Sequence, residues 1–160
     1  MTYSDEFLRR VLSEAKVIAM VGASTNPVRA SYFVASYFNA RGRRIIPVNP
    51  SIAGETLFGE RVLSDISEID CQVDMIDIFR RSDQVPAIVD AALAHLMPGL
   101  KSIWMQFNVV NEEAAAKAEA AGLDVVMNRC PKVEYARLMR EIGAVGIPSR
   151  VISSKLTQKI

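Results

Sequence analysis

Three small polar residues follow a glycine at the end of an apolar run, in the stretch VGASTN, residues 21–26. The apolar run is typical of a buried strand, and the residues from Ala30 onward have helical spacing. A tight turn from a strand into a helix exposes backbone N–H groups at the helix start, and such groups bind phosphate. Arg29, expected in the first helical turn, adds a charged donor. The same residues also fit a plain turn in which a Ser, Thr or Asn side chain caps the helix.

The loop matches neither common phosphate-binding motif. A P-loop needs Gly-Lys-Ser/Thr, which is absent here. In the dinucleotide motif GxGxxG, Ser24 and Pro27 stand where the second and third glycines belong, and Gly22 alone remains. NAD-binding folds place Asp or Glu about twenty residues further on, where this chain has RGRR, residues 41–44. The missing acid disfavours NAD.

Two pairs of arginines are candidates for binding a phosphate. Arg43 and Arg44 begin the second predicted strand, about 15 Å from its carboxyl end, and are interpreted as solvated charges at the far edge. Arg80 and Arg81 follow the third predicted strand directly, so they lie at the carboxyl edge, where ligands of parallel sheets bind. The simpler interpretation of the second pair is an exposed loop.

Other residues at the predicted carboxyl edge complete a mixed polar and apolar surface. Asn49 and Pro50 lie at the end of the second strand, Phe79 precedes the two arginines, and Gln106 lies near the end of the fourth strand. The set combines anion donors, an amide and apolar area. It suits a long nucleotide-containing ligand with an extra phosphate.

The remaining reactive residue types do not form a catalytic set. His95, the one histidine, lies inside a predicted helix and is interpreted as structural. Cys130 precedes Pro131 at a predicted helix start, where a thiol pKa can be lowered; otherwise it is a small buried or capping residue. Asp74 and Asp77 lie three apart on a strand and point to opposite faces, which excludes a paired acid–base site, although Asp77 could orient a nearby loop.

The composition limits the classes of partner. The chain has 160 residues, half of them hydrophobic, and a formal net charge of +1, which disfavours bulk nucleic-acid binding. Its two cysteines show neither CxxC nor zinc spacing, and its N-terminus is polar. No apolar run approaches the roughly 20 residues that span a bilayer. We expect a cytoplasmic protein with no metal site that binds neither nucleic acid nor membranes.

Five strands alternating with helices must position these residues. The strands are predicted at residues 17–22, 44–49, 73–79, 102–107 and 124–127. Helices are predicted over residues 4–15, from about Ala30 to Gly42, from a Ser82 or Asp83 cap, from an Asn111 cap to Gly122, and after Pro131. Pro27 is placed in the first turn of the second helix. Pro47 is placed at or just beyond the last paired residue of its strand, because proline cannot donate to a central ladder.

This alternation predicts an α/β fold: a Rossmann-like, doubly wound, five-stranded parallel sheet with helices on both faces. The leading strand order is 3-2-1-4-5, with the ligand outside the carboxyl ends of the strands. No linker or repeat marks a second domain. One domain is expected over residues 1–146, followed by a polar C-terminal arm over residues 147–160.

A series of segments resembles a known family over most of the chain, from about Val17 to Lys155. The segments are VGASTNPVRAS, IIPVNP, VDMIDIFRRSDQVP, IWMQFNVVNEEAAAKAEAAGLDVVMNRCPKVE and RVISSK. Together they resemble the small stand-alone CoA-binding proteins and the CoA-binding Rossmann domain of the succinyl-CoA synthetase alpha subunit.

The resemblance implies coenzyme A or an acyl-CoA as the ligand. In that family the glycine-led loop holds CoA phosphates, the segment after the second strand lies near the nucleotide, and the segment after the third lies along the pantetheine arm. Carried over by position, the implied binding residues are Gly22, Ala23, Ser24, Thr25, Asn26, Arg29, Asn49, Pro50, Phe79, Arg80 and Arg81. The chain departs from the pattern at Asn108, where glycine is common, and at Asp83, where glutamate is common.

The resemblance favours a CoA-binding module with no catalytic residues of its own. The larger relatives phosphorylate a histidine in a domain that this chain lacks. Two alternatives stay open: an NADP-dependent oxidoreductase, and a regulatory subunit that binds a protein partner through the polar arm. A homo-oligomer is also compatible with the sequence.

Overall fold

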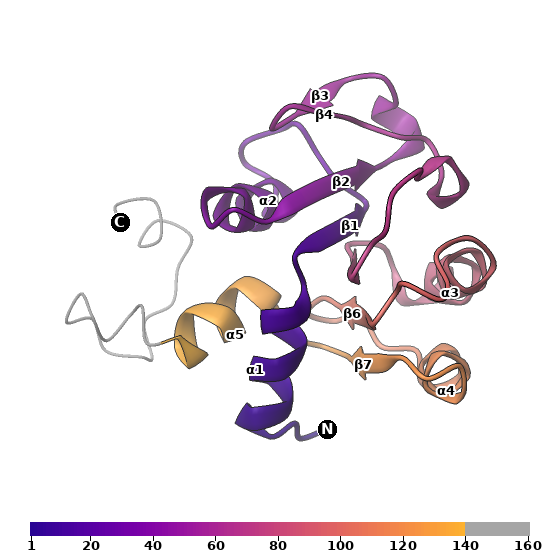
Figure 1. Cartoon of the computed structure of the whole chain (residues 1–160). Helices are drawn as coiled ribbons and strands as arrows, with labels where there is room; N and C mark the ends of the chain where they lie inside the picture. The colour runs from indigo at the N-terminus through magenta and orange to yellow at the C-terminus, as the bar shows by residue number, and fades with distance from the viewer. Residues whose placement is uncertain (140–160) are drawn as a thin grey trace.

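Five parallel strands form the centre of the fold. The structure, a computed structural model, describes residues 1–139. The sheet order is β2-β1-β5-β6-β7, and all neighbouring pairs are parallel (Figure 1). The strands are β1 (Val17–Val21), β2 (Arg44–Val48), β5 (Met75–Ile78), β6 (Ser102–Met105) and β7 (Asp124–Val126). The prediction of a five-stranded parallel α/β sheet is therefore confirmed.

Helices cover both faces of this sheet. They are α1 (Asp5–Glu14), α2 (Ala30–Ala40), α3 (Val85–His95), α4 (Glu112–Ala120) and α5 (Pro131–Leu138). One core joins α1, α2 and α5 to the face that carries Met20, Met75 and Trp104. The other joins α3 and α4 to the face that carries Ile76 and Ile103. Trp104 and Met105 are fully buried.

The predicted strand order 3-2-1-4-5 is wrong. Counted along the chain, the five sheet strands have the order 2-1-3-4-5, because β5 pairs with the free side of β1. In the predicted order β2 would be an inner strand. Its Pro47 has no N–H, and an outermost position lets the missing donor face away from β1.

Pro47 also lies further inside its strand than predicted. It pairs with Met20, and Val48 continues the ladder by pairing with Val21. The carbonyl of Pro47 accepts a hydrogen bond from Leu63 N (2.9 Å) on the outer side, where the contact is an isolated bridge rather than a full strand. An edge strand tolerates proline at such a position.

Helix starts follow the expected capping chemistry in some places and not in others. Ser4 Oγ caps α1, and Asn111 Oδ1 caps α4 by accepting from Ala114 N. Pro27, however, lies in the turn before α2 rather than in its first turn. Ser82 and Asp83 belong to a short 3-10 helix, Ser82–Gln84, and neither side chain caps α3. Ser82 Oγ instead accepts a hydrogen bond from Val110 N.

The connection between β2 and β5 holds structure that the alternation of strands and helices did not predict. It contains a 3-10 turn at Pro50–Ile52, a hairpin of β3 (Thr56–Leu57) and β4 (Glu60–Arg61), and a 3-10 turn at Ile66–Glu68. Phe58 and Gly59, both at positive φ, make the hairpin turn. Its short, polar pieces lack the long apolar periods on which the prediction rested.

The two arginines at the amino edge have different environments. Arg44 is exposed and pairs with Glu60 (2.6 Å), in agreement with a solvated charge. Arg43 is buried, with its guanidinium carbon 5.8 Å from the centre of the Tyr135 ring, so the prediction of a solvated charge is wrong there. The cause is α5, which packs against α2 near this edge.

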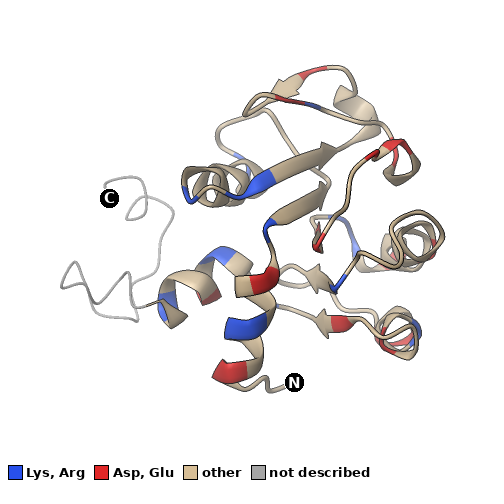
Figure 2. Cartoon of the chain, viewed as in Figure 1, with Lys and Arg blue, Asp and Glu red and all other residues tan. Residues whose placement is uncertain are grey.

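Acidic and basic residues occur together on some of the helices. Figure 2 shows both colours on α1 and on α4. Within residues 1–139, no helix is long and apolar enough to cross a membrane. The proposed domain boundary at residue 146 and the polar arm over residues 147–160 lie outside the described residues.

Candidate ligand site at the carboxyl edge

The ends of β1, β2 and β5 meet at the carboxyl edge of the sheet. Gly22 N donates to the carbonyl of Val48 (2.9 Å), and Phe79 N donates to the carbonyl of Val21 (2.8 Å). The loop after β1 leads into α2 on one face, and the loop after β5 leads through Ser82–Gln84 into α3 on the other. The crevice between two such loops, where the winding of the sheet reverses, is where ligands of this architecture bind.

Asn49 connects three of the predicted segments by hydrogen bonds. Its Nδ2 donates to the carbonyl of Ala23 (2.8 Å). Its Oδ1 accepts from Arg80 Nη2 (3.0 Å) and from the N–H of Ser51 (3.0 Å). Residues far apart in sequence are therefore brought together as predicted, and Arg80 is held in a defined position beside the first loop.

Gly22 is required by its conformation and by its neighbours. Its φ is +91°, in the left-handed region that L side chains rarely adopt. A Cβ at this position would lie 2.7 Å from the carbonyl oxygen of Phe79. The loop can therefore follow β1 this closely beside β5 only with glycine.

The polar side chains of the first loop are used within the protein. Ser24 Oγ accepts from Asn26 N (3.0 Å), Asn26 Oδ1 accepts from Val28 N (3.1 Å), and Thr25 Oγ1 donates to Glu55 Oε2 (2.6 Å). The backbone N–H groups of Ser24 and Thr25 have no acceptor among residues 1–139. These two N–H groups, more than the side chains, are the donors that the loop offers to an anion.

Two predicted arginines lie away from the Asn49 network. Arg29 is exposed and is the N-cap residue of α2, without a side-chain capping bond. Arg81 is 78% exposed and forms an ion pair with Asp83 (3.1 Å). An exposed pair of this kind contributes little to stability, so the Arg81 side chain is available to a ligand at little cost.

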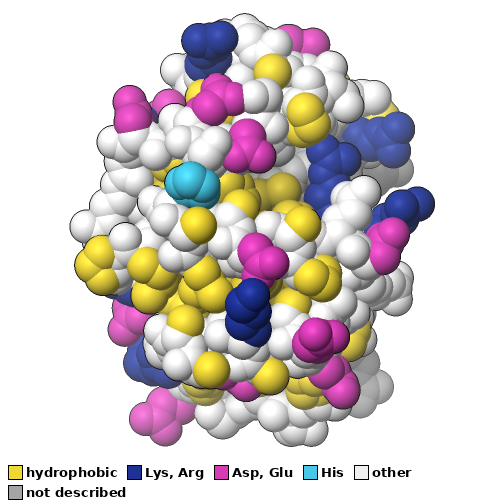
Figure 3. Space-filling view, turned by 90° about the vertical axis from the view of Figure 1, so that its right-hand side faces the viewer, with side chains coloured by type: hydrophobic (Ala, Val, Ile, Leu, Met, Phe, Trp, Pro, Cys, Tyr) yellow, Lys and Arg dark blue, Asp and Glu magenta, His cyan; other side chains and the backbone are white. Residues whose placement is uncertain are grey.

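A pocket of about 590 Å³ opens beside the network, on the face covered by α3. Figure 3 shows a recess with a hydrophobic floor on the side of the molecule that carries α3. Pro50 and Arg80 are the predicted residues that line it. The others are Val21, Val48, Ser51, Ser64, Asp65, Ile66, Asp83, Gln84, Ala87, Ile88 and Ala91.

The sequence interpretation missed most of this pocket. Ser64, Asp65 and Ile66 come from the connection for which no element was predicted, and Ile88 and Ala91 lie on α3. The Asp65 side chain accepts a hydrogen bond from Ser67 N. Hydrogen bonding to Ser67 lowers the pKa of the Asp65 carboxyl group. An Asp followed two residues later by a polar residue in a turn is the one local signal that could have marked this segment.

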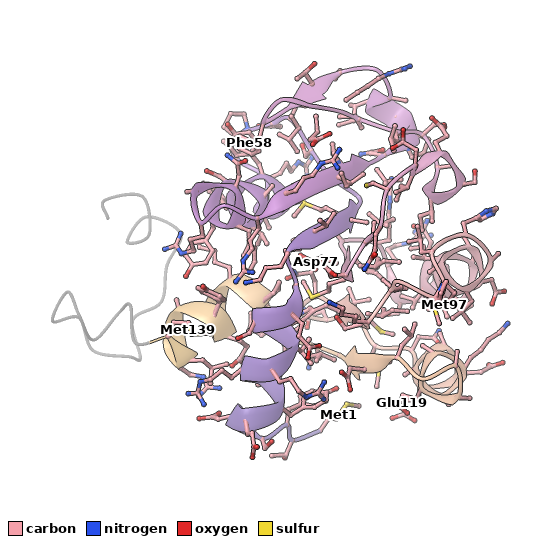
Figure 4. All side chains as sticks on the ribbon, in the orientation of Figure 1. Met1, Phe58, Asp77, Met97, Glu119 and Met139 are labelled. Atoms are coloured by element: carbon pink, nitrogen blue, oxygen red, sulfur yellow. The ribbon has the colours of Figure 1, made fainter. Side chains whose placement is uncertain are left out.

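A buried polar pair lies on the opposite face, next to β6. Gln106 Nε2 donates to Asp77 Oδ1 (2.8 Å), and Asp77 is fully buried (Figure 4). Burial raises the pKa of Asp77 to about 7, against a smaller lowering by the Gln106 hydrogen bond. Asp77 thus orients the residue that begins the loop after β6, in line with the interpretation from sequence.

The remaining candidate groups have structural environments. Burial raises the pKa of the Cys130 thiol to about 11, so the alternative of a lowered pKa is wrong. His95 is the exposed last residue of α3. Asp74 accepts from the N–H groups of Lys16 and Val17 and pairs with Lys101, separately from Asp77. Within residues 1–139 no group of three or more His, Cys, Asp or Glu could hold a metal ion.

Asn108 has the backbone conformation that glycine favours. Its φ is +64°, and its N–H donates to Asn128 Oδ1 (2.8 Å). Asparagine is one of the few residues that tolerate this region. The departure from the family pattern therefore leaves a glycine-like turn after β6.

Comparisons with known proteins agree with this geometry. A family model described as a CoA binding domain matches residues 16–136. YneT of Bacillus subtilis (strain 168) is 36% identical over 129 residues, covering 81% of this chain and 92% of YneT. The solved structure of cell-free ID.343 from Thermus thermophilus is 37% identical with a TM-score of 0.78, covering 85% of this chain and 99% of that one.

A larger enzyme shares the fold. The dinucleotide forming acetyl-coenzyme A synthetase 1 of Ca. Korarchaeum cryptofilum is 23% identical, with a TM-score of 0.60 over 74% of this chain and 27% of the synthetase. The family model covers most of the chain, including the loop after β1, Asn49 and Arg80. This chain therefore belongs to the CoA-binding domain family.

Proposed function

We propose that this protein binds coenzyme A or an acyl-CoA at the carboxyl edge of its sheet, without catalysing a reaction of its own. The observation that carries the proposal is the hydrogen-bonded series Ala23–Asn49–Arg80, which lies beside the pocket under α3. It holds the Arg80 side chain, which lines an apolar recess, and links Arg80 through Asn49 to the loop after β1. Family membership supports CoA as the ligand.

The hydrogen-bond donors of this edge match the phosphate groups of CoA, and its apolar surface matches the adenine ring or the pantetheine arm. The N–H groups of Ser24 and Thr25 and the guanidinium groups of Arg80 and Arg81 are donors for phosphate oxygens. The apolar side chains of Val21, Val48 and Ile88 provide a surface for the adenine ring or the pantetheine arm. A CoA with its 3′-phosphate uses more of these donors than a ligand without it.

Binding without catalysis fits the ionisable groups within residues 1–139. Asp77 is fully buried, and the raised pKa of the Cys130 thiol keeps it protonated and a poor nucleophile at neutral pH. His95 is exposed at the end of α3. None of these groups pairs with another as a nucleophile and base do.

Calorimetric titration of the full chain with CoA tests the proposal. We expect saturable binding that Arg80→Ala weakens by at least about tenfold, because a charged hydrogen-bond donor to phosphate is lost. Arg44→Ala is the matched control: it removes an arginine of the same sheet at the opposite edge and leaves the affinity unchanged. 3′-Dephospho-CoA should bind more weakly than CoA.

Three results would contradict this assignment. CoA that gives neither heat nor a thermal shift at millimolar concentration removes the proposed ligand. An equal loss in the Arg44 and Arg80 variants removes the proposed location. Tighter binding of NADPH than of CoA supports the oxidoreductase alternative in its place.

A further inference from the structure

Gln106 lies within reach of the same crevice but on the other face of the sheet from the pocket. Its backbone N–H donates to the carbonyl of Ile78 (3.3 Å), the last residue of β5, so Gln106 lies beside Phe79. Its side chain is turned back along β5 to Asp77, whose neighbours in the sheet are Met20 and Trp104. β5 lies between β1 and β6, so Gln106 is about two strand spacings, or about 10 Å, from the end of β1.

The nitrogen and the oxygen of the Gln106 carboxamide differ in their hydrogen bonding. Nε2 donates to Asp77, whereas Oε1 accepts no hydrogen bond within residues 1–139. Within residues 1–139, the buried side-chain nitrogen and oxygen atoms that have no hydrogen-bond partner are Arg43 Nη1 and Asp77 Oδ2. Oε1 is not among them, so it is not completely sealed, although the Gln106 residue as a whole is only 6% exposed. A carboxamide oxygen held in this way is a hydrogen-bond acceptor for a ligand.

Asp77 accounts for the orientation of this carboxamide. Asp77 Oδ1 accepts from the NH2 end of Gln106, which leaves the amide oxygen facing away. The ionised carboxylate, which prevails above pH 7, can only accept and therefore favours this orientation. Burying Asp77 in the apolar core is costly, and its Oδ2 has no partner to offset that cost. Leucine would fill the same place without this penalty, which indicates that the carboxylate has a role beyond packing.

We propose that Asp77 is a positioning residue that holds Gln106 Oε1 as the acceptor for an amide N–H of the pantetheine arm. The inference rests on the proposed function and names the part of the ligand that this side of the crevice takes. The pantetheine arm contains two secondary amides, and in extended form it is long enough to pass from the nucleotide across the end of β5 to Gln106. Nucleotides without this arm do not reach the amide.

The test compares two ligands, CoA and adenosine 3′,5′-bisphosphate, which lacks the pantetheine arm, on the full chain. We expect the ratio of their affinities to favour CoA, and Gln106→Leu to reduce that ratio about three- to tenfold without changing bisphosphate binding. Asp77→Leu should reduce the ratio similarly. Asp77→Asn should restore it, because an asparagine oxygen also accepts from Gln106 Nε2.

The outcomes separate this inference from the proposed function. If neither ligand binds the unmodified chain, the proposed function fails and the inference with it. If both bind but Gln106→Leu leaves the ratio unchanged, the inference alone is wrong. A ratio lowered in Gln106→Leu but kept in Asp77→Leu removes the positioning role of Asp77, as does an Asp77→Leu variant that weakens both ligands equally.

A second measurement decides the case in which Asp77→Leu does not fold. The side-chain NH2 signals of Gln106, identified by their loss in Gln106→Leu, are followed by NMR in the unmodified chain and in Asp77→Asn. We expect CoA to shift them in both and the bisphosphate in neither. Signals that respond equally to the two ligands, or to neither, overturn the proposal.

Discussion

The ionisation of Asp77 affects the stability of the folded state, because its carboxyl group is fully buried. Burial raises its pKa from 3.8 to about 7, so the folded chain binds this proton more tightly than the unfolded chain. The stabilisation from the protonated form is complete below about pH 4 and is lost as the pH rises towards 7. Above pH 7 the cost of the buried carboxylate is constant.

Asp77→Asn should therefore stabilise the protein at neutral pH by removing a buried charge. We expect the difference in unfolding free energy between variant and parent to grow from pH 4 to pH 7, to the order of a few kcal/mol, and then to level off. Urea unfolding over pH 4–8 measures it. Asp65→Asn is the control: the pKa of Asp65 is lowered, so its contribution changes at more acidic pH and stays flat over pH 5–8. Parallel pH profiles of the Asp77 variant and the parent would contradict the assignment.

A comparison of two glycines with positive φ distinguishes the energetic cost of backbone strain from the cost of steric contact. Gly22 has φ +91° and the carbonyl of Phe79 in the way of a Cβ, whereas Gly42 has φ +75° and open space around it. Gly42→Ala should cost about 1 kcal/mol from strain alone, and Gly22→Ala about 3 kcal/mol or more because β1 and β5 must move apart. Chemical unfolding compares the two. Equal costs would mean that the close approach to Phe79 contributes nothing.

At the scale of elements, hydrogen bonds from single side chains tie the loops of the carboxyl edge to one another. Asn111 caps α4 through Ala114 N and donates to the carbonyl of Ser82, at the start of the loop into α3. Ser82 in turn accepts from Val110 N. The ends of β5 and β6 are therefore coupled through side chains rather than through strand pairing.

Asn111→Ala should lower the unfolding free energy by about 1–2 kcal/mol, because it removes the helix cap and leaves the carbonyl of Ser82 without this donor. Thermal unfolding followed by circular dichroism measures the loss. Glu119→Ala, at an exposed position near the other end of α4, should stay within about 0.5 kcal/mol of the parent. A similar change in both variants would mean that the cap is not formed in solution.

At the scale of the whole molecule, one sheet separates two hydrophobic cores. Trp104, the one tryptophan, is fully buried on the face covered by α1, α2 and α5. Val89 of α3 is fully buried on the opposite face. The strands belong to both cores, so loss of packing on one face should unfold the other as well.

Val89→Ala should therefore shift the unfolding transition seen by Trp104 fluorescence, although the two side chains lie on opposite faces. We expect a loss of about 2 kcal/mol and a transition that coincides with the one followed by far-ultraviolet circular dichroism. Val28→Ala, at a position that is 77% exposed, is the control and should have no effect. A Trp104 transition that does not move in Val89→Ala would show that the two cores unfold independently.

The sequence alone determined the local features of this protein. Apolar runs predicted the five sheet strands, because a strand buried on both faces needs apolar side chains throughout. The loop after β1, Asn49 and Arg80 could be assigned to one edge of the sheet, since the carboxyl ends of all parallel strands lie at the same edge. Resemblance to a CoA-binding family then implied CoA as the ligand.

Only the tertiary structure decided what depends on contacts between distant segments. The strand order is 2-1-3-4-5 because the third strand, β5, pairs with β1 on the side away from β2. The alternation of strands and helices along the chain does not predict this, because it is the same for either strand order. Arg43 is buried because α5 returns to α2, and the pocket is completed by Ser64, Asp65 and Ile66 from a connection without periodicity. The pairing of Asp77 with Gln106 likewise requires adjacent strands, since 29 positions separate the two residues along the chain.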